Sequence, residues 1–401
     1  MSSGNLIRHS FVLETEYGVT PAGDLQAISK TSTAFTGTPD VTSSQTIRDD
    51  RLPSGNIVTG LTVTGNIANE LSRTIIHDTF IEACMMNTWD ATPAPLPFTD
   101  LAFVSSTGTL SATSGLSALA NGDVFTISGL TGAGAPFNLT TSFVVTNAIG
   151  DTSVVVATGS TVTDWSAGEG GAASIQAGAG ISIGITPQRS YTFEKRYLDL
   201  TAATSSITYL GEIFSAFSGE FNYGSPVTIT YDLQGAGKVL PTTPLSDDGR
   251  AVIDAPTENF MNPSTAMPML LIDGAVATYC VEGITLSLDN GLSAKNCVGQ
   301  LNKAGYDLGT AAIEVGVNAH FSDSNYAYLQ RILDQDTVEI EWSVIDSDGY
   351  GYHFSVSCQL TGDDPDVESQ DAQAMLALTG SGAIGTDGLV LTISKLGGDL
   401  P

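Results

Sequence analysis

The sequence predicts a mainly β protein with one or two short flanking helices and a small inserted all-β module. Hydrophobic residues make up 42% of the 401 positions and charged residues only 14%, while glycine occurs 43 times. That composition is typical of strands joined by tight turns. Apolar and polar residues alternate in many segments, whereas helical spacing is confined to a few short ones. A chain of this length can bury a sizeable core and form two or three domains.

The stretch from Gly309 to Val344 predicts a strand, a helix and a second strand. Apolar residues alternate with polar ones over 313–321 and again over 338–342, which is the pattern of half-buried strands. Between these strands, the segment 322–333 begins with side chains that can cap a helix and continues with apolar residues at helical spacing. We therefore expect a short helix that packs one apolar stripe on a sheet.

A similar unit is expected near the start of the chain. Alternation over 61–71 predicts a strand, and the segment 73–89 then places Ile76, Phe80 and Ala83 or Cys84 on one helical face. Three closely spaced prolines follow as a stiff connector. Two such units in one chain suggest an internal duplication.

Residues 101–188 are expected to form the inserted module, because they contain no lysine or arginine and carry repeated turn signals between short apolar runs. Three to five short antiparallel strands would account for this pattern. Strand-like sequence resumes afterwards, so we expect a core domain of residues 1–100 and 189–401 with the module at its periphery. The acids of the module are Asp123, Asp151, Asp164 and Glu169.

The rest of the core domain is mostly predicted strand. Five prolines between 235 and 275 instead predict a long irregular loop that could reach a neighbouring molecule. Asn290-Gly291 and the segment 346–349 are turn signals, and 372–378 is compatible with either a strand or a helix. Strands are expected over 191–200, 207–213, 216–233, 279–288, 350–360 and 389–393.

The charge of the chain limits its partners. Fourteen lysines and arginines stand against 43 acids, for a formal net charge of -29. Such a surface repels nucleic acid and anionic lipid at physiological salt. This charge therefore disfavours a protein that grips DNA, whereas a conduit that must not grip DNA is compatible with it. The alternative is that the acidity only keeps an abundant protein in solution.

Targeting and cysteine signals are weak. The N-terminus has no cationic segment followed by an apolar core, and no apolar run approaches the length of a membrane span. The four cysteines have neither CxxC nor zinc-site spacing. We expect buried, reduced thiols in a protein made in a cytoplasm.

No residue pattern demands catalysis, a cofactor or a metal. There is no GxSxG motif, and none of the four histidines has metal-ligand spacing, so each is expected to be structural. Glu339 and Glu341 share one face of a predicted strand. Three interpretations of that pair stay open: a glycosidase pair, an exposed sheet face, or the acidic wall of a channel.

Four segments together resemble the major tail proteins, or tail tube proteins, of long non-contractile-tailed bacteriophages (siphophages). The first is ETEYGVTP at 14–21, and the second runs from 46 to 72 and continues into the helix that ends at Trp89. The third is the segment 282–333, and the fourth is the hairpin that contains Trp342 and the sequence IDSDGYGYHFSV. The resemblance covers most of the chain outside 101–188.

The resemblance implies a β-sandwich or barrel-like core flanked by a helix, of the tail-tube type. It implies six-membered rings that stack into a tube through which the genome passes, in the tail of a virion assembled in the host cytoplasm. Tape measure, tail tip and tail terminator proteins would be partners, with no enzyme activity, no cofactor and no membrane. The arm 14–51 and the loop 235–275 are candidates for contacts between rings.

If the tube has an acidic lumen, DNA would slide through it without adhering. The candidate lumen-facing acids are Glu339, Glu341, Glu314 and Glu70. Two functions of other classes remain as alternatives. One is a carbohydrate-binding or adhesin-like β protein of a virion or cell surface, and the other is a β-rich glycoside hydrolase.

Overall fold

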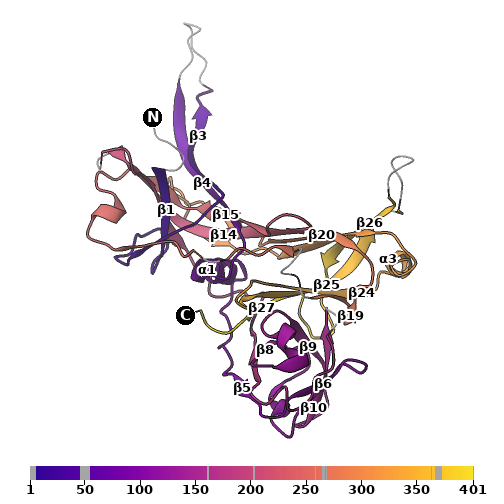
Figure 1. Cartoon of the computed structure of the whole chain (residues 1–401). Coiled ribbons are helices and arrows are strands. Elements are labelled where there is room, and N and C mark those ends of the chain that lie inside the picture. The colour runs from indigo at the N-terminus through magenta and orange to yellow at the C-terminus, as the bar shows by residue number, and fades with distance from the viewer. Residues whose placement is uncertain are drawn as a thin grey trace.

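The computed structural model confirms a mainly β fold (Figure 1). None of the helices among the described residues is long and apolar enough to cross a membrane. The structure describes residues 6–45, 55–159, 162–201, 204–257, 259–263, 267, 269–362, 364–365 and 373–400.

Two layers of antiparallel strands face each other across the main core (Figure 1). β25 pairs with strands of both layers and so joins them. The upper layer consists, in order, of β3 (Ser32–Ser43), β4 (Asn56–Glu70), β15 (Thr228–Gly235), β14 (Ser206–Asn222), β20 (Val281–Asp289), β23 (Ala312–His320) and β26 (Met375–Gly382). The lower layer consists of β18 (Met269–Ile272), β24 (Thr337–Ile345), β25 (Gly351–Gly362), β27 (Leu391–Leu396) and β12 (Ala179–Ser182).

Aromatic side chains fill the space between the layers. Trp342 of β24 is fully buried and stacks on Phe354 of β25, with 5.2 Å between the ring centroids. Phe221 of the upper layer meets both rings edge-on. The predicted hairpin with a buried tryptophan is therefore confirmed, and aromatic packing joins the two layers.

Helix α1 (Ile75–Cys84) closes one end of this core. Thr74 caps it, because its hydroxyl accepts a hydrogen bond from the backbone N–H of His77 at 3.2 Å. Phe80, on the predicted apolar face, packs against Phe214 with 4.7 Å between the rings. Helix α3 (Ala327–Asp334), the other helix expected from the sequence, lies at the far end over β25 and has no fully buried residue.

A side lobe extends from the first half of β14, where residues 206–210 pair with β13 and β16. It consists of β1 (Ile7–Leu13), β2 (Leu25–Ala27), β13 (Tyr191–Tyr197), β16 (Gly237–Val239) and β17 (Val252–Ile253). The irregular loop predicted over 235–275 is therefore only partly correct, because β16, β17 and β18 pair within it. Two short hairpin elements complete the core: β19 (Ala275–Val276) beside β18, and β21 (Ser293–Ala294) with β22 (Tyr306–Asp307).

The small sheet lies beneath the lower layer (Figure 1). It has more strands than the three to five expected, with two 3-10 helices at Leu116–Ala118 and Gly132–Phe137. Its strand order is β5 (Leu96–Pro97), β11 (Ser174–Ala177), β8 (Val124–Ser128), β9 (Ser142–Ala148), β10 (Ser153–Thr158), β7 (Thr109–Ser111) and β6 (Ala102–Val104).

The small sheet has a core of its own around Phe125, Phe143 and Trp165. Strand pairing places residues 96–97 in the small sheet and 179–182 in the lower layer. The division at 101 and 188 stays a prediction, and this pairing favours slightly earlier boundaries on both sides.

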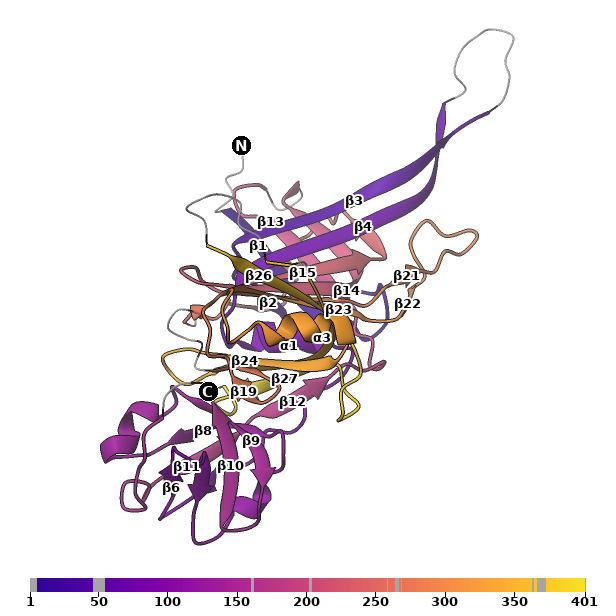
Figure 2. The same cartoon turned by 90° about the vertical axis from the view of Figure 1, so that its right-hand side faces the viewer.

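The hairpin of β3 and β4 continues beyond the upper layer, and this projecting hairpin is called the arm from here on (Figure 2). It includes only part of the predicted arm 14–51, because residues 25–27 form β2 and pair with β1 in the side lobe. Residues 46–54, which follow β3 in the sequence, lie outside the described residues. β26 settles the ambiguous segment 372–378 as a strand from Met375 onward. The final strand begins at Leu391, two residues later than expected.

Candidate functional site

The outward face of the upper layer, here called the polar face, consists of short polar and acidic side chains. The strands that form it alternate with period two, so that Ile229, Tyr231 and Leu233 of β15 enter the core. Thr228, Thr230 and their outward neighbours are left on the other side. The polar face is thus fixed by the same alternation that builds the core.

Strand register aligns these outward residues in rows across the layer, from β4 to β23 or β26. The first row is Glu70, Thr228, Glu220, Thr285, Gly316 and Thr379. The second row is Ala68, Thr230, Ser218, Ser287, Glu314 and Ser381. The third row is Asn66, Asp232, Ala216, Asp289 and Ala312.

No lysine, arginine or aromatic side chain stands in these rows. The two acids in the first row, Glu70 and Glu220, lie two strands apart, a separation of roughly 10 Å at the usual strand spacing. That separation is about one Debye length at 0.1 M salt, so their fields add at the surface. Asn66 donates a hydrogen bond to Asp232 at 2.6 Å. The surface is shallow, acidic and without anchoring groups for a polyanion.

The four acids predicted to face a lumen fall into two pairs. Glu70 and Glu314 lie on the polar face and are exposed. Glu339 and Glu341 instead lie on the outward face of the lower layer, where the small sheet docks, and Glu341 is only 7% exposed. Burial, and then the neighbouring Glu341, raise the pKa of Glu339. The sequence could not separate these pairs, because both strands alternate in the same way.

Apolar contacts hold the small sheet against the lower layer. Val124 and Val144 of the small sheet form one buried cluster with residues of the lower layer. The hydroxyl of Ser142 also lies 2.9 Å from that of Ser343. The residues that the lower layer contributes to the cluster are Met269, Leu271, Ile345 and Leu396.

Ser343, His353 and Glu341 have the residue types of a hydrolytic triad. The Ser343 Oγ lies 3.0 Å from His353 Nδ1, and His353 Nε2 lies 3.4 Å from a Glu341 oxygen. However, Ser343 is 0% exposed and its hydroxyl contacts Ser142 beneath the small sheet. A substrate has no route to this hydroxyl, so the network serves to pair polar groups at a buried interface.

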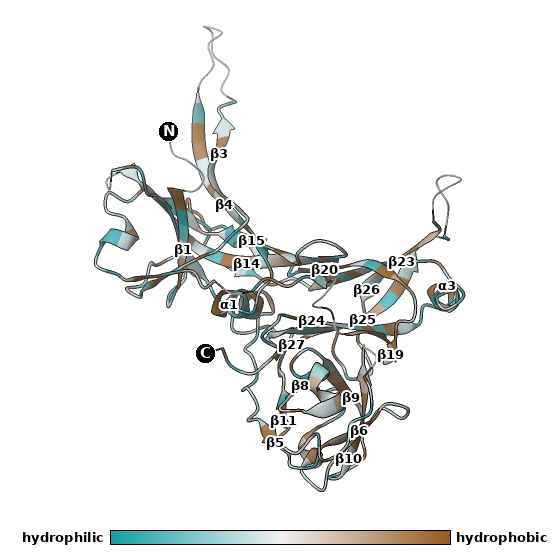
Figure 3. Ribbon diagram, in the orientation of Figure 1, coloured by the Kyte–Doolittle hydropathy of each residue, from teal (hydrophilic) through white to brown (hydrophobic). Residues whose placement is uncertain are grey.

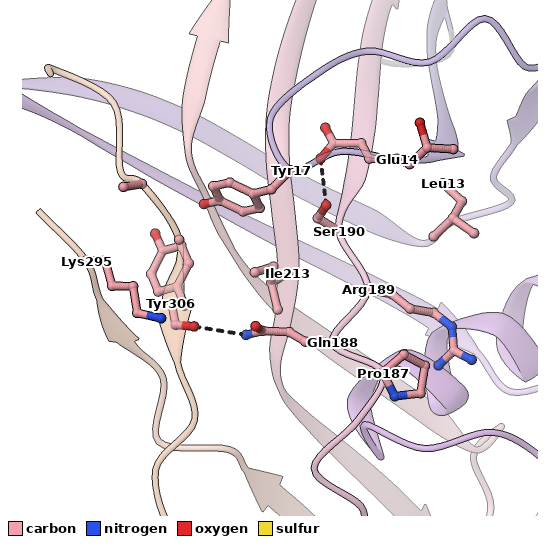
Figure 4. Close-up of a pocket in the computed structure, with 13 residues that line it drawn as sticks. Leu13, Glu14, Tyr17, Pro187, Gln188, Arg189, Ser190, Ile213, Lys295 and Tyr306 are labelled. Atoms are coloured by element: carbon pink, nitrogen blue, oxygen red, sulfur yellow. Dashed lines mark hydrogen bonds between the residues drawn. The ribbon is translucent and has the colours of Figure 1, made fainter. Parts of the chain in front are cut away.

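A cleft of about 540 Å³ separates the side lobe from β22 (Figure 4). Its cations are already paired, because Arg189 contacts Glu82 at 3.0 Å and Lys295 contacts Asp307 at 2.5 Å. Among the described residues, no group of three or more histidine, cysteine or acidic side chains could hold a metal ion.

The cysteine prediction is half correct. All four thiols are free, and Cys84 and Cys358 are buried. Cys280 and Cys297 are exposed, because they lie in connecting segments and not inside strands. Burial raises the pKa of Cys358 to about 12.

Comparison with known proteins identifies the family. A family model described as phage tail tube protein matches residues 4–382, which is nearly the whole chain. No curated protein matches the chain. The family match agrees with the mainly β fold and with the resemblance of the sequence to tail tube proteins. The chain therefore belongs to the phage tail tube protein family and is a structural component of a bacteriophage tail.

Proposed function

We propose that the protein is the repeating subunit of stacked rings and that its polar face lines the lumen through which the genome enters the host. The observation that carries this proposal is the three rows of outward residues, which lack lysine and arginine across the whole layer. Phosphates find no cation on such a surface and are repelled by its acids. DNA would then pass without specific binding.

In this proposal Glu70 and Glu314 line the lumen together with Glu220, Asp232 and Asp289. Glu339 and Glu341 would not line it, since the small sheet covers their side of the lower layer. The small sheet lies on the opposite side of the sandwich from the polar face (Figure 1). It would therefore decorate the outside of the tube.

Ring closure would use the open edge of the upper layer at β3, because β26 at the other end pairs with β25. β3 pairs only with β4 among the described strands, so its other edge has free backbone groups. A head-to-tail contact between copies closes into a ring when the rotation allows it. The proposal includes six copies per ring, a siphophage tail and assembly in the host cytoplasm. It also includes tape measure, tail tip and tail terminator proteins as partners, and no enzyme activity.

The arm would contact a neighbouring subunit. Val41, Ile57 and Val58 on the arm are 57%, 66% and 47% exposed, and an apolar band crosses the arm in Figure 3. Three large apolar side chains on one projecting hairpin are costly in water unless a second surface covers them. The arm is therefore proposed as a contact between rings. The segments within 235–275 are proposed as a second such contact.

The test adds positive charge to the polar face. Ser218→Lys with Thr285→Lys changes two exposed residues of that face, and Ser106→Lys with Asn147→Lys adds the same charge to the small sheet. We expect both variants to form tubes in electron micrographs. Only the polar-face variant should slow DNA release from virions, with an effect that weakens as salt rises. Equal release by the two variants would contradict the placement of the lumen.

A further inference from the structure

We propose that Glu212 is held as a neutral carboxylic acid at the corner of β14, and that loss of its proton loosens the side lobe from the upper layer. This inference is independent of the proposed lumen. It concerns a buried acid that neither the ring contacts nor the polar face uses.

Glu212 lies where β14 passes from one set of partners to another. Residues 206–210 pair with β13 and β16 in the side lobe, whereas residues 213–222 pair with β15 and β20 in the upper layer. Gly211 has φ +65° at this corner, and a Cβ there would lie 2.7 Å from Ala236 Cβ and 3.0 Å from the Tyr17 ring. The corner thus requires glycine, and Glu212 follows it directly.

The Glu212 carboxyl group has nothing to stabilise a charge. The side chain is 0% exposed, and neither of its oxygens has a hydrogen-bond partner among the described residues. It packs against Gly235, where an added Cβ would lie 2.3 Å from the Glu212 Oε1. An ionised carboxylate without partners or water is far more costly to bury than the neutral acid.

Glu14, in the segment after β1, is the opposite case (Figure 4). Its carboxylate accepts hydrogen bonds from the N–H groups of Gly18 at 2.8 Å and Gly211 at 2.9 Å. It also accepts hydrogen bonds from the hydroxyls of Ser190 and Thr192, each at 2.7 Å. Four donors suit an ionised carboxylate. The Glu14 carboxyl group is thus fully hydrogen-bonded, whereas the Glu212 carboxyl group has no partner among the described residues.

The ionisable groups around Glu212 cannot compensate a second charge. Glu14 repels it, and the other groups are the phenols of Tyr17, Tyr209 and Tyr306, with Tyr191 as the register partner on β13. None of these can become a cation. Burial, and then Glu14, raise the pKa of Glu212 from 4.5 to about 8.

The raised pKa of Glu212 makes the stability of the folded protein depend on pH. Between pH 4.5 and about 8 the folded protein keeps a proton that the unfolded chain has lost. Stability therefore falls as pH rises through this window and levels off above it. Over about 3.5 pH units, the unfolding equilibrium constant rises by on the order of 1000-fold. The Glu14 segment borders the cleft of about 540 Å³, which gives it room to move when the corner loosens.

The experiment compares Glu212→Gln with Glu220→Gln, which changes an exposed glutamate on the same strand. Urea unfolding is measured from pH 5 to pH 9. Wild type and Glu220→Gln should lose stability toward pH 8, whereas Glu212→Gln should lose at least 30-fold less in its unfolding constant. Hydrogen-exchange protection in β1 and β13 should fall above pH 8 in wild type and stay constant in Glu212→Gln. The same pH slope in all three proteins would overturn the proposal.

A second measurement covers the case in which Glu212→Gln does not fold. Infrared titration of the wild-type protein should show a protonated carboxyl band at pH 7 that disappears near pH 8. Glu212→Asp should shift this band, and Glu220→Gln should leave it unchanged. Absence of the band at pH 7 in wild type would refute the neutral acid.

Discussion

Removal of the Arg73 side chain should destabilise the protein through one buried ion pair. Arg73 is 1% exposed, and its Nε donates to Asp78 at 2.9 Å. Its terminal nitrogens donate to the carbonyl oxygens of Leu396 at 2.9 Å and Gly398 at 3.3 Å. One guanidinium thus ties the start of α1 to the end of β27.

The loss of unfolding free energy in Arg73→Met depends on the groups that remain around Asp78. Breaking a buried ion pair on one side costs about 3–5 kcal/mol, because the remaining charge has no equal partner. Tyr352 still donates to Asp78 at 2.7 Å, and Lys395 lies 3.7 Å from it, so some compensation remains. We therefore expect about 3 kcal/mol, at the lower end of that range.

Urea unfolding at pH 7 tests this value, with Lys295→Met as the control because Lys295 is 50% exposed in its ion pair with Asp307. A double mutant with Asp78→Asn should recover part of the loss, since no unpaired carboxylate then stays buried. A loss below about 1 kcal/mol for Arg73→Met would refute the argument, because that is the range of an exposed ion pair.

Three further predictions concern the small sheet and the thiols. Deletion of residues 96–177 uncovers Met269, Leu271, Ile345 and Leu396, so the deleted protein should aggregate in gel filtration unless these four residues are made polar. Hydrogen bonds from hydroxyl and backbone N–H groups lower the pKa of Asp151, Asp164 and Glu169. These ionised carboxylates stabilise the small sheet at pH values above their ordinary pKa, and this stabilisation is lost as pH falls through their lowered pKa values. Hydrogen exchange in the small sheet should therefore accelerate below about pH 4. An Asp164→Asn variant should show a smaller acceleration. Cys280 and Cys297 should react with a thiol reagent in the folded protein, whereas Cys84 and Cys358 should react only after denaturation.

Local patterns were enough to predict most elements. The alternation over 313–321 corresponds to β23 within one residue at each end, and the turn at 346–349 joins β24 and β25 as expected. The strand and the turn could both be predicted because each depends on residues that are close together in the sequence. The pairing of β23 with β26 could not be predicted, because its register depends on contacts between distant segments.

The candidate site was only half predictable for the same reason. Glu314 and Glu341 each stand at an outward position of an alternating strand, so their local patterns are equivalent. Alternation along a strand predicts which residues share a face. It does not predict which layer the strand joins or which other element covers that face. The His353 and Ser343 pair was equally hidden, although it follows from the register of one hairpin.

The outward residues of the two layers nevertheless differ in a way that the sequence records. Residues 269–272 are apolar at all four positions, and β18 accordingly packs its two faces against the main core and the small sheet. The outward positions of β15 are only threonine, aspartate and glutamine. A strand that is apolar on both faces requires cover on both sides. A strand with small polar outward residues is compatible with water on that side. Loss of strict alternation in β18 therefore marks the docking face. Glu341 lies on β24, which alternates strictly, so only the pairing of β18 with β24 assigns Glu341 to that face and separates it from Glu314.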